Sequence, residues 1–233
     1  MQSLIYLIPC VLEESATETI PPYIIDAVKN CQVIFAENER TARRFLKSIC
    51  KEIVIDDYEW FTIHKAENEV LSAFRQKIKE GKNIGIISEA GCPGIADPGQ
   101  ILIAAAQEMT ATIKPLVGPS SILLALMASG MNGQQFEFVG YLPIDNLERN
   151  KAITALETSS QKKNSTQIFI ETPYRNNQLI ETLLKTCKPS TRLCIAAELT
   201  GAGEFIKTRT VADWKKEKTD FHKKPVIFLL HAV

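Results

Sequence analysis

The sequence predicts an α/β fold made of two consecutive domains. Short aliphatic segments alternate with longer amphipathic ones along the 233 residues, as strands alternate with helices in this class. A loop rich in glycine and proline, residues 88–99, lies between a strand-like and a helix-like segment. A second α/β series begins near residue 115, which predicts one domain over residues 1–114 and another over residues 115–233.

The first domain is expected to alternate strands with helices from its N-terminus. Pro21 and Pro22 favour the start of a helix that carries Ile24, Ile25 and Val28 on its apolar side. Further helices are expected after residue 40, over the apolar stripe of residues 70–78, and directly after the glycine-rich loop. Strands are expected at residues 4–8, 33–36, 53–55, 84–87 and 112–117.

The second domain repeats this alternation. Ser120 and Ser121 suit the start of a helix because a serine side chain can accept from unpaired helix N–H groups, and Gly130 suits its end. Helices are also expected near residues 147–157 and 176–187. Strands are expected at residues 136–139, 167–171, 193–198 and 226–230.

Composition excludes several classes of protein. The net charge is zero and the pI is about 6.8, so no overall basic field indicates nucleic acid. The apolar run at residues 122–128 is too short to span a bilayer, and no basic segment precedes the N-terminal apolar residues. The six cysteines and three histidines show no metal-ligand spacing. We therefore expect a cytoplasmic protein without a membrane partner or a metal site.

Common nucleotide and hydrolase motifs are missing. The turn after the first strand, residues 9–14, contains no glycine, which argues against a dinucleotide-binding Rossmann unit. There is no P-loop and no Gly-x-Ser-x-Gly elbow. The glycine-rich loop nevertheless follows a strand, where open α/β folds bind ligands. A ligand loop is the favoured interpretation, and a plain tight connection is the alternative.

Motifs along the chain resemble those of the tetrapyrrole (corrin/porphyrin) methylase superfamily. Residues 87–99, ISEAGCPGIADPG, resemble its S-D-A-G-T-P-x-I-x-D-P-G signature, and residues 36–40, AENER, resemble its A-E-D-T-R. Residues 118–121, 140–143, 171–175 and 197–200 resemble its P-G-P-S, G-F-L-P, E-S/T-P-H-R and R-E-L-T motifs, in the same order. The branch that the chain most resembles is ribosomal RNA small-subunit methyltransferase I, which methylates a cytidine ribose 2′-hydroxyl.

The resemblance implies an S-adenosylmethionine-dependent methyltransferase that forms a homodimer. It implies two α/β domains with the cofactor in the cleft between them. The carboxylate of this cofactor suits the free N–H groups at a helix start such as Ser120 and Ser121, although a capped helix without a ligand is the alternative there. The expected cofactor-binding residues are Pro9, Ser88, Glu89, Ala90, Gly91, Cys92, Pro93, Gly94, Gly118, Pro119, Ser120 and Ser121.

Several side chains are candidates for the chemistry. A sulfonium methyl group is already activated, so alignment of the acceptor should matter more than any single base. The candidate catalytic residues are Glu37, Arg40, Asp97 and Glu171, and Glu89 and Glu198 are further possible bases. For each carboxylate, a cap or an ion pair is the alternative role.

The substrate is expected to be RNA, with Arg40, Arg43, Arg44, Lys47 and Arg175 as RNA-binding residues. The first four, with Lys51, follow helical spacing, and no acidic residue interrupts this stripe. A solvated helix face is the alternative. Residues 11–14, VLEE, lack the Gly and Asn of the family's first loop. A methyltransferase acting on a small tetrapyrrole-like substrate and a catalytically silent cofactor- or RNA-binding relative therefore stay open.

Overall fold

A computed structural model describes residues 3–63, 67–96 and 99–232 of the chain. The chain divides into two compact units, Met1–Ser120 and Ser121–Val233. The division lies a few residues beyond the expected break after residue 114. Its position follows from strand β5 (Thr112–Pro115), which pairs with strand β1 (Leu4–Ile8) and so belongs to the first unit.

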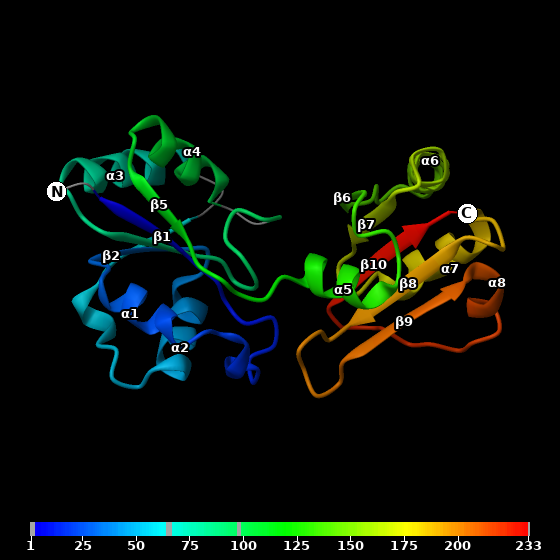
Figure 1. Cartoon of the computed structure of the whole chain (residues 1–233), viewed down its shortest axis with the longest axis horizontal. Coiled ribbons are helices and arrows are strands. Elements are labelled where there is room, and N and C mark those ends of the chain that lie inside the picture. The colour runs from blue at the N-terminus through cyan, green and yellow to red at the C-terminus, as the bar shows by residue number, and fades with distance from the viewer. Residues whose placement is uncertain (1–2, 64–66, 97–98, 233) are drawn as a thin grey trace. The chain divides into compact units, whose positions relative to one another are not determined.

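The first unit is built on a parallel sheet of five strands (Figure 1). Its other strands are β2 (Val33–Ala36), β3 (Glu59–Thr62) and β4 (Ile84–Ile87), and the order is β3-β2-β4-β1-β5. Strands β2 and β4 are buried along their whole length. Continuous aliphatic strands are typical of a parallel sheet that is covered on both faces.

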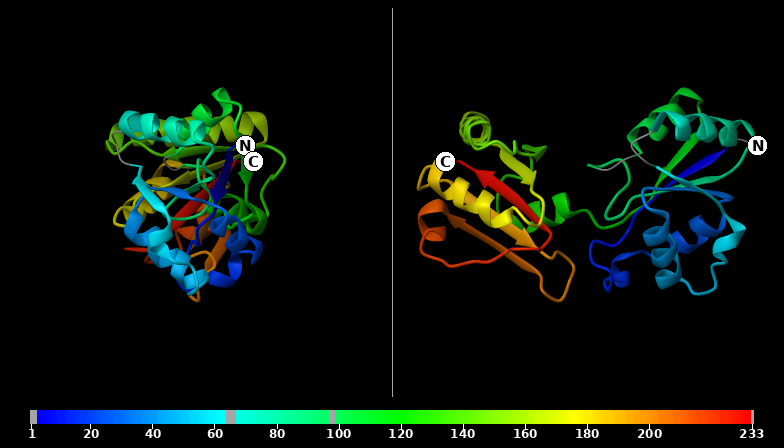
Figure 2. Two further views of the ribbon diagram at one scale, coloured as in Figure 1. Left: turned by 90° about the vertical axis from the view of Figure 1, so that its left-hand side faces the viewer. Right: turned by 180° about the vertical axis from the view of Figure 1, so that it is seen from behind.

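Helices cover the two faces of this sheet in pairs, as both views of Figure 2 show. Helices α1 (Tyr23–Lys29) and α2 (Glu39–Ile49) pack on one face, and α3 (Glu67–Lys79) and α4 (Gln100–Glu108) pack on the other. The alternating side chains of β2 divide between the two cores, Ile34 toward the first pair and Phe35 toward the second. The predicted helices of this unit are confirmed.

The strand expected at residues 53–55 is wrong. Ile53 is buried in the core of α1 and α2, whereas Val54 is exposed, and residues Ile55–Asp57 form a 3₁₀ turn. The strand that pairs with β2 is β3, a few residues later. Ile53 and Ile55 therefore pack against the core without joining the sheet. Tertiary packing overrides their preference for a β-strand.

The second unit contains a mixed sheet with the order β6-β7-β10-β8-β9. Its strands are β6 (Phe136–Tyr141), β7 (Thr166–Ile170), β8 (Arg192–Ala197), β9 (Phe205–Thr210) and β10 (Val226–His231). Only β6 and β7 pair in parallel among these described strands. Strand β9 was not predicted, and neither was the short helix α8 (Val211–Trp214) that follows it.

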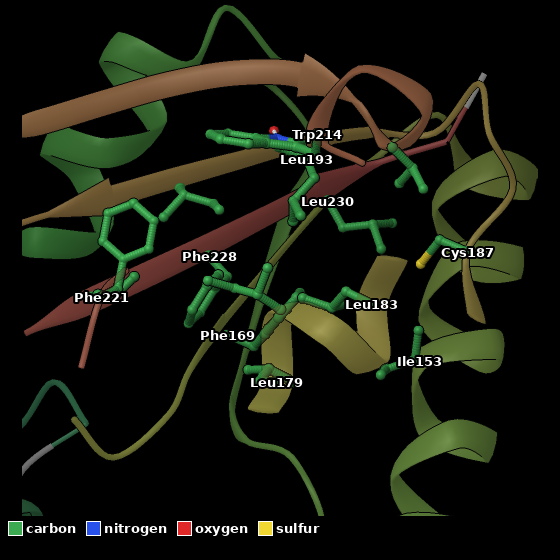
Figure 3. Close-up of a cluster of buried hydrophobic side chains, with 14 of the residues drawn as sticks. Ile153, Phe169, Leu179, Leu183, Cys187, Leu193, Trp214, Phe221, Phe228 and Leu230 are labelled. Carbon is green, nitrogen blue, oxygen red and sulfur yellow. Dashed lines mark hydrogen bonds between the residues drawn. The ribbon is translucent and has the colours of Figure 1, made fainter. Parts of the chain in front are cut away.

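One face of this sheet carries the core of the second unit (Figure 3). Side chains of helices α6 (Asn146–Lys163), α7 (Asn176–Thr186) and α8 pack there against Phe169 and Phe228, whose rings stack at 5.8 Å. Helix α5 (Ser121–Ser129) contacts β9 and β10, and the Thr208 hydroxyl of β9 donates to the Ser129 carbonyl at 2.7 Å. The α/β class is thus confirmed. Among the described residues, no helix is both long and apolar enough to cross a membrane.

Candidate active site

The predicted site residues of the first unit lie in loops that follow the carboxyl ends of four parallel strands. Ile8 of β1 and Ala36 of β2 both lie beside Ile87 of β4, and Leu7 lies beside Pro115 of β5. The loops that begin at Pro9, Glu37, Ser88 and Leu116 therefore leave the sheet at one edge, which we call the carboxyl edge. Parallel pairing places these loops together although they are far apart in sequence.

The loops after β1 and β4 leave this edge in opposite directions. The first leads to α1 on one face of the sheet, and the second leads to α4 on the other face. Because β1 and β4 are neighbours, the space between their loops is a topological switch point. Open α/β sheets bind ligands at such a point, outside the carboxyl ends of the strands.

A pair of backbone hydrogen bonds joins these two loops. The Cys10 N–H donates to the Gly91 carbonyl at 2.8 Å, and the Gly91 N–H donates to the Cys10 carbonyl at 3.1 Å. Gly91 has a φ of 71°, which residues with a Cβ rarely adopt. A Cβ at Gly91 would point into the space between the Leu12 side chain and the Pro119 carbonyl, 3.5 and 3.6 Å away. The absence of a side chain at Gly91 thus leaves a space where the loops after β1, β4 and β5 meet.

The loop after β5 packs directly on the loop after β1. A Cβ built on Gly118 would lie 2.1 Å from Cβ of Pro9, which is closer than any real contact. The Cys92 thiol donates to the Pro119 carbonyl at 3.5 Å and so links the β4 loop to the same segment. The Val117 N–H donates to the Tyr23 hydroxyl at 2.7 Å, a contact that sequence reasoning missed. The three expected cofactor segments therefore form one assembly.

Exposure differs along the β4 loop. Ser88 is buried and its hydroxyl donates to the Ala90 carbonyl at 3.3 Å, whereas Glu89 and Ala90 are exposed. Pro93 is buried, and Gly94 follows with a φ of 79°. Glu89 and Ala90 are therefore exposed on a loop that buried residues hold in place.

Glu37 connects the ends of β2 and β4. Its Oε2 accepts from the Glu89 N–H at 3.0 Å. Burial raises the pKa of the Glu37 carboxyl, the Glu89 amide opposes this by stabilising the charged form, and the Glu89 charge raises the pKa further. Glu37 is the predicted catalytic carboxylate that lies among the described loops of the carboxyl edge.

The raised pKa of Glu37 makes a prediction for stability. A carboxyl whose pKa is raised by folding contributes stability that is complete below its usual value of 4.5 and is lost as the pH rises through the folded value. In Glu37→Gln the amide stays neutral and can still accept from Glu89. We expect this variant to melt at the same or a higher temperature than the wild type at neutral pH, with the difference vanishing in acid.

Thermal melts across this pH range, with the exposed Glu18→Gln as a matched control, measure the difference. A Glu37→Gln variant that is destabilised equally at acid and neutral pH would contradict the assigned cause.

Cys10 is unsuited to act as a nucleophile at this edge. Its side chain is buried, and burial raises the pKa of the thiol to about 12, against the opposing hydrogen bond with Val11. Thiolates are the reactive form of cysteine. The Cys10 side chain therefore serves packing.

The other predicted catalytic residues are placed differently. Arg40 is exposed in the first turn of α2, where its N–H donates to the Asn38 side chain at 3.1 Å. Asp97 lies outside the described residues. Glu171 follows β7 in the second unit with a side chain that is 1% exposed. Its Oε1 accepts from Arg175 at 2.7 and 3.0 Å, so the geometry of Glu171 and Arg175 is that of an ion pair.

The basic stripe on α2 forms as predicted, but acidic residues meet it. Ala42, Phe45 and Leu46 are buried on the opposite side of the helix. Arg43 pairs with Glu39 at 2.6 Å and lies 5.0 Å over the Trp60 ring.

Two further basic residues of the stripe have partners. Arg44 pairs with Glu14 at 2.8 Å, and the Lys47 ammonium donates to the Lys51 carbonyl at 3.0 Å. The interpretation that no acid interrupts the stripe was wrong, because Glu39 and Glu14 reach it in space. Surface ion pairs of this kind are weak, so both arginines can exchange partners.

Comparison with known proteins finds a family and relatives that match most of the chain. The tetrapyrrole (corrin/porphyrin) methylase family matches residues 15–214. Ribosomal RNA small subunit methyltransferase I of Buchnera aphidicola subsp. Schizaphis graminum is 28% identical over 230 residues, which are 97% of this chain and 77% of that protein. The protein of the same name from Bacillus subtilis is 27% identical over 217 residues, or 92% and 70% of the two chains.

A solved structure shares the fold. The crystal structure of the methyltransferase CobJ has a TM-score of 0.66 to this chain at 16% sequence identity. The match covers 100% of this chain and 95% of that one. At this identity the likeness concerns the fold alone, and it extends over both units.

Proposed function

The chain belongs to the tetrapyrrole (corrin/porphyrin) methylase family and is an S-adenosylmethionine-dependent methyltransferase, and we propose that it methylates a cytidine ribose 2′-hydroxyl of small-subunit ribosomal RNA. The observation that carries the substrate is the match over 97% of this chain to a protein named for small-subunit ribosomal RNA. Such a substrate would place the enzyme in the cytoplasm, and the homodimer and the cofactor cleft between the domains stay predictions.

The carboxyl edge of the first unit supports a cofactor seat on its loops. Within this unit we assign the seat to Pro9, to residues 88–94 and to residues 118–120, whereas Ser121, the remaining expected cofactor residue, begins the second unit. The fit rests on the space between Leu12 and Pro119 that a Cβ at Gly91 would fill, since only glycine keeps that space open. Glu89 and Ala90 are exposed there. The Glu89 N–H already donates to Glu37 and the Ala90 carbonyl already accepts from Ser88, so the Glu89 carbonyl and the Ala90 N–H are the backbone groups that we assign to orienting the adenine or the carboxylate.

Positioning is the main contribution of the protein to the reaction. The bound cofactor supplies an activated methyl group, so what remains is to hold the ribose oxygen in line with it. Correct placement can lower a barrier by about 7–11 kcal/mol, whereas a general base adds about 10²–10⁴-fold. The ribose hydroxyl must lose its proton as its oxygen accepts the methyl group. We propose that the Glu37 carboxylate accepts this proton, since the raised pKa of its carboxyl lies closer to neutral pH than that of an ordinary glutamate.

The direct test is transfer of labelled methyl groups to small-subunit ribosomal RNA from a strain that lacks this protein. Nucleoside mapping should then find one labelled 2′-O-methylcytidine, and RNA from the parent strain should accept no label. A label on a base, or no label on any RNA, would contradict the proposal that a ribose 2′-hydroxyl accepts the methyl group. Turnover with a tetrapyrrole-like molecule would favour the small-substrate alternative, and absence of turnover with either class would favour the silent relative.

The basic stripe of α2 makes a separate prediction about RNA binding. Arg40 and Lys47 are exposed, and glutamate is tolerated near position 40 because acids suit the first turn of a helix. If about three basic side chains of the stripe contact phosphates, the log–log salt slope of RNA binding should be about −2. We expect the double variant Arg40→Glu, Lys47→Glu to bind RNA at least about tenfold more weakly, with a flatter slope.

The control for this double variant is Lys82→Glu, an exposed lysine in the turn after α3. Titration of a fluorescent RNA at several salt concentrations gives both affinity and slope, and cofactor binding monitors the fold. Equal affinity and slope in the double variant and the control would remove α2 from the RNA interface.

A further inference from the structure

Helix α6 of the second unit carries a buried arginine without a counter-charge. Arg149 is 1% exposed and ranks among the largest fully buried side chains of the chain. Its Nη2 donates to the Asn146 side chain, but Nε and Nη1 have no hydrogen-bond acceptor in the described part of the chain. None of the ion pairs among the described residues includes Arg149; those nearest to it in sequence on α6 and α7 are Lys151 with Glu148 and Lys185 with Glu181.

A buried guanidinium that has unpaired N–H donors and no counter-charge is stabilised by a bound anion. Arginine side chains stay protonated in proteins, so a buried guanidinium is a buried charge. Burying an unpaired charge is among the most costly arrangements in a protein, and nearly all buried polar hydrogens have an acceptor. The two orphaned donors, Nε and Nη1, belong to the planar fork with which arginine holds carboxylates and phosphates.

Arg149 lines a cavity of about 350 Å³ between helices α6 and α7. It is the buried member of the lining, whereas Asn146, Asn150 and Gln178 are exposed at the rim. The Thr186 hydroxyl of α7 donates to Asn150 Oδ1 of α6 at 3.3 Å and so joins the two walls. Every side chain of the lining is polar.

The lining presents more donors than acceptors. Asn146 and Asn150 each use their Oδ1 as an acceptor within the protein, which leaves their NH₂ groups as the donors they can offer. Lys185 adds an ammonium group, and the one carboxylate of the lining, Glu181, lies 3.6 Å from it. The formal charge of the lining is therefore +1, contributed by Arg149 at its base.

We propose that this cavity binds a phosphate group, with the Arg149 guanidinium as its charge partner. A tetrahedral phosphate accepts hydrogen bonds from several directions, which suits a lining that contains the Arg149 guanidinium, the amides of α6 and the Lys185 ammonium of α7. The group can be a free phosphate or a phosphodiester of bound RNA. The RNA source rests on the proposed function, whereas the phosphate site itself does not.

The test begins with inorganic phosphate and the full-length protein. Phosphate should raise the melting temperature of the wild type more than chloride does at equal ionic strength, because a ligand of the native state stabilises it. Arg149→Met removes the charge and keeps an unbranched chain. We expect it to melt at or above the wild-type temperature without phosphate, since an unpaired buried charge is gone, and to show no phosphate-specific rise.

A second variant tests the site even if Arg149→Met fails to fold. Lys185 is exposed, so Lys185→Met should fold normally and bind phosphate several-fold more weakly, as read from ³¹P line broadening. Lys151→Met, an exposed lysine of α6 outside this cavity, should bind phosphate like the wild type. The proposal is overturned if phosphate stabilises the wild type no more than it stabilises Arg149→Met, or if Lys185→Met and Lys151→Met bind it equally.

The source of the phosphate is read from competition. An RNA oligonucleotide with hydroxyl ends should displace inorganic phosphate, and lose affinity in Arg149→Met, if the site takes a backbone phosphodiester. Phosphate binding without such competition identifies a free phosphate as the ligand. Failure of the wild type to methylate ribosomal RNA would contradict the proposed function and leave the phosphate titration unaffected.

Discussion

Replacement of Gly118 by alanine is expected to weaken the binding of S-adenosylhomocysteine, the product form of the proposed cofactor. The added Cβ would lie 2.1 Å from Cβ and 2.4 Å from Cγ of Pro9. A proline ring cannot rotate aside, so the loops after β1 and β5 must separate, and overpacking of this kind costs about 1–3 kcal/mol. Because the same loops form the proposed seat, we expect this cost to appear as about a 5- to 140-fold loss of affinity.

A matched variant makes this result specific. Gly133→Ala adds the same methyl group where no atom of the described residues, apart from its chain neighbours, lies within 4 Å, so this variant should bind the cofactor product like the wild type. Isothermal titration gives the affinities, and hydrogen exchange of β10 shows whether the second unit stays folded. Equal affinities for Gly118→Ala and Gly133→Ala would show that the contact with Pro9 is unrelated to cofactor binding.

Trp214→Ala is expected to destabilise the second unit by about 3–5 kcal/mol, the usual cost of removing a buried aromatic side chain. The Trp214 ring is 1% exposed and packs in the core of this unit (Figure 3). Its Nε1–H donates to the Leu193 carbonyl at 2.8 Å, so the short helix α8 is tied to strand β8. Loss of both the packing and this hydrogen bond should loosen β8 and β9 first.

Hydrogen exchange followed by mass spectrometry localises this effect. Exchange should accelerate in β8 and β9 and stay unchanged in β2 of the first unit, because the two units have separate cores. Trp214→Phe keeps much of the packing but loses the hydrogen bond, so its effect should lie between those of the wild type and Trp214→Ala. Uniform acceleration in both units would show that they unfold together.

Local pattern in the chain was enough to place most helices and strands. The strands at residues 4–8, 33–36 and 84–87 were predicted with the bounds that the structure has. Each is a continuous aliphatic segment between breakers, and both faces of the parallel sheet require such residues. The same reasoning found the amphipathic face of α2, since helical spacing is a local property.

Strand pairing and charge pairing were decided only in three dimensions. Residues 53–55 have the local pattern of a strand, yet Ile53 and Ile55 pack in the core of α1 and α2 and Val54 is exposed, and the strand at this edge of the sheet is β3. Strand β9 carries Lys207 and Arg209 and is only partly buried, so its sequence gives a weak strand signal, and its pairing with β8 defines it. Pairing partners lie far apart in sequence, and no local periodicity encodes them.

Part of the candidate site could likewise be predicted from the sequence, and part is decided only by the fold. The glycine-rich loop at residues 88–99 was recognisable from its residue types, because glycine and proline have specific backbone preferences. That Gly91 bonds to Cys10 and that Gly118 touches Pro9 follows from the strand order β4-β1-β5, which brings three loops to one edge. Arg149 lies within the helix expected near residues 147–157, and no local pattern marks it as buried; the packing of α6 on α7 makes it a buried charge that lines a polar cavity.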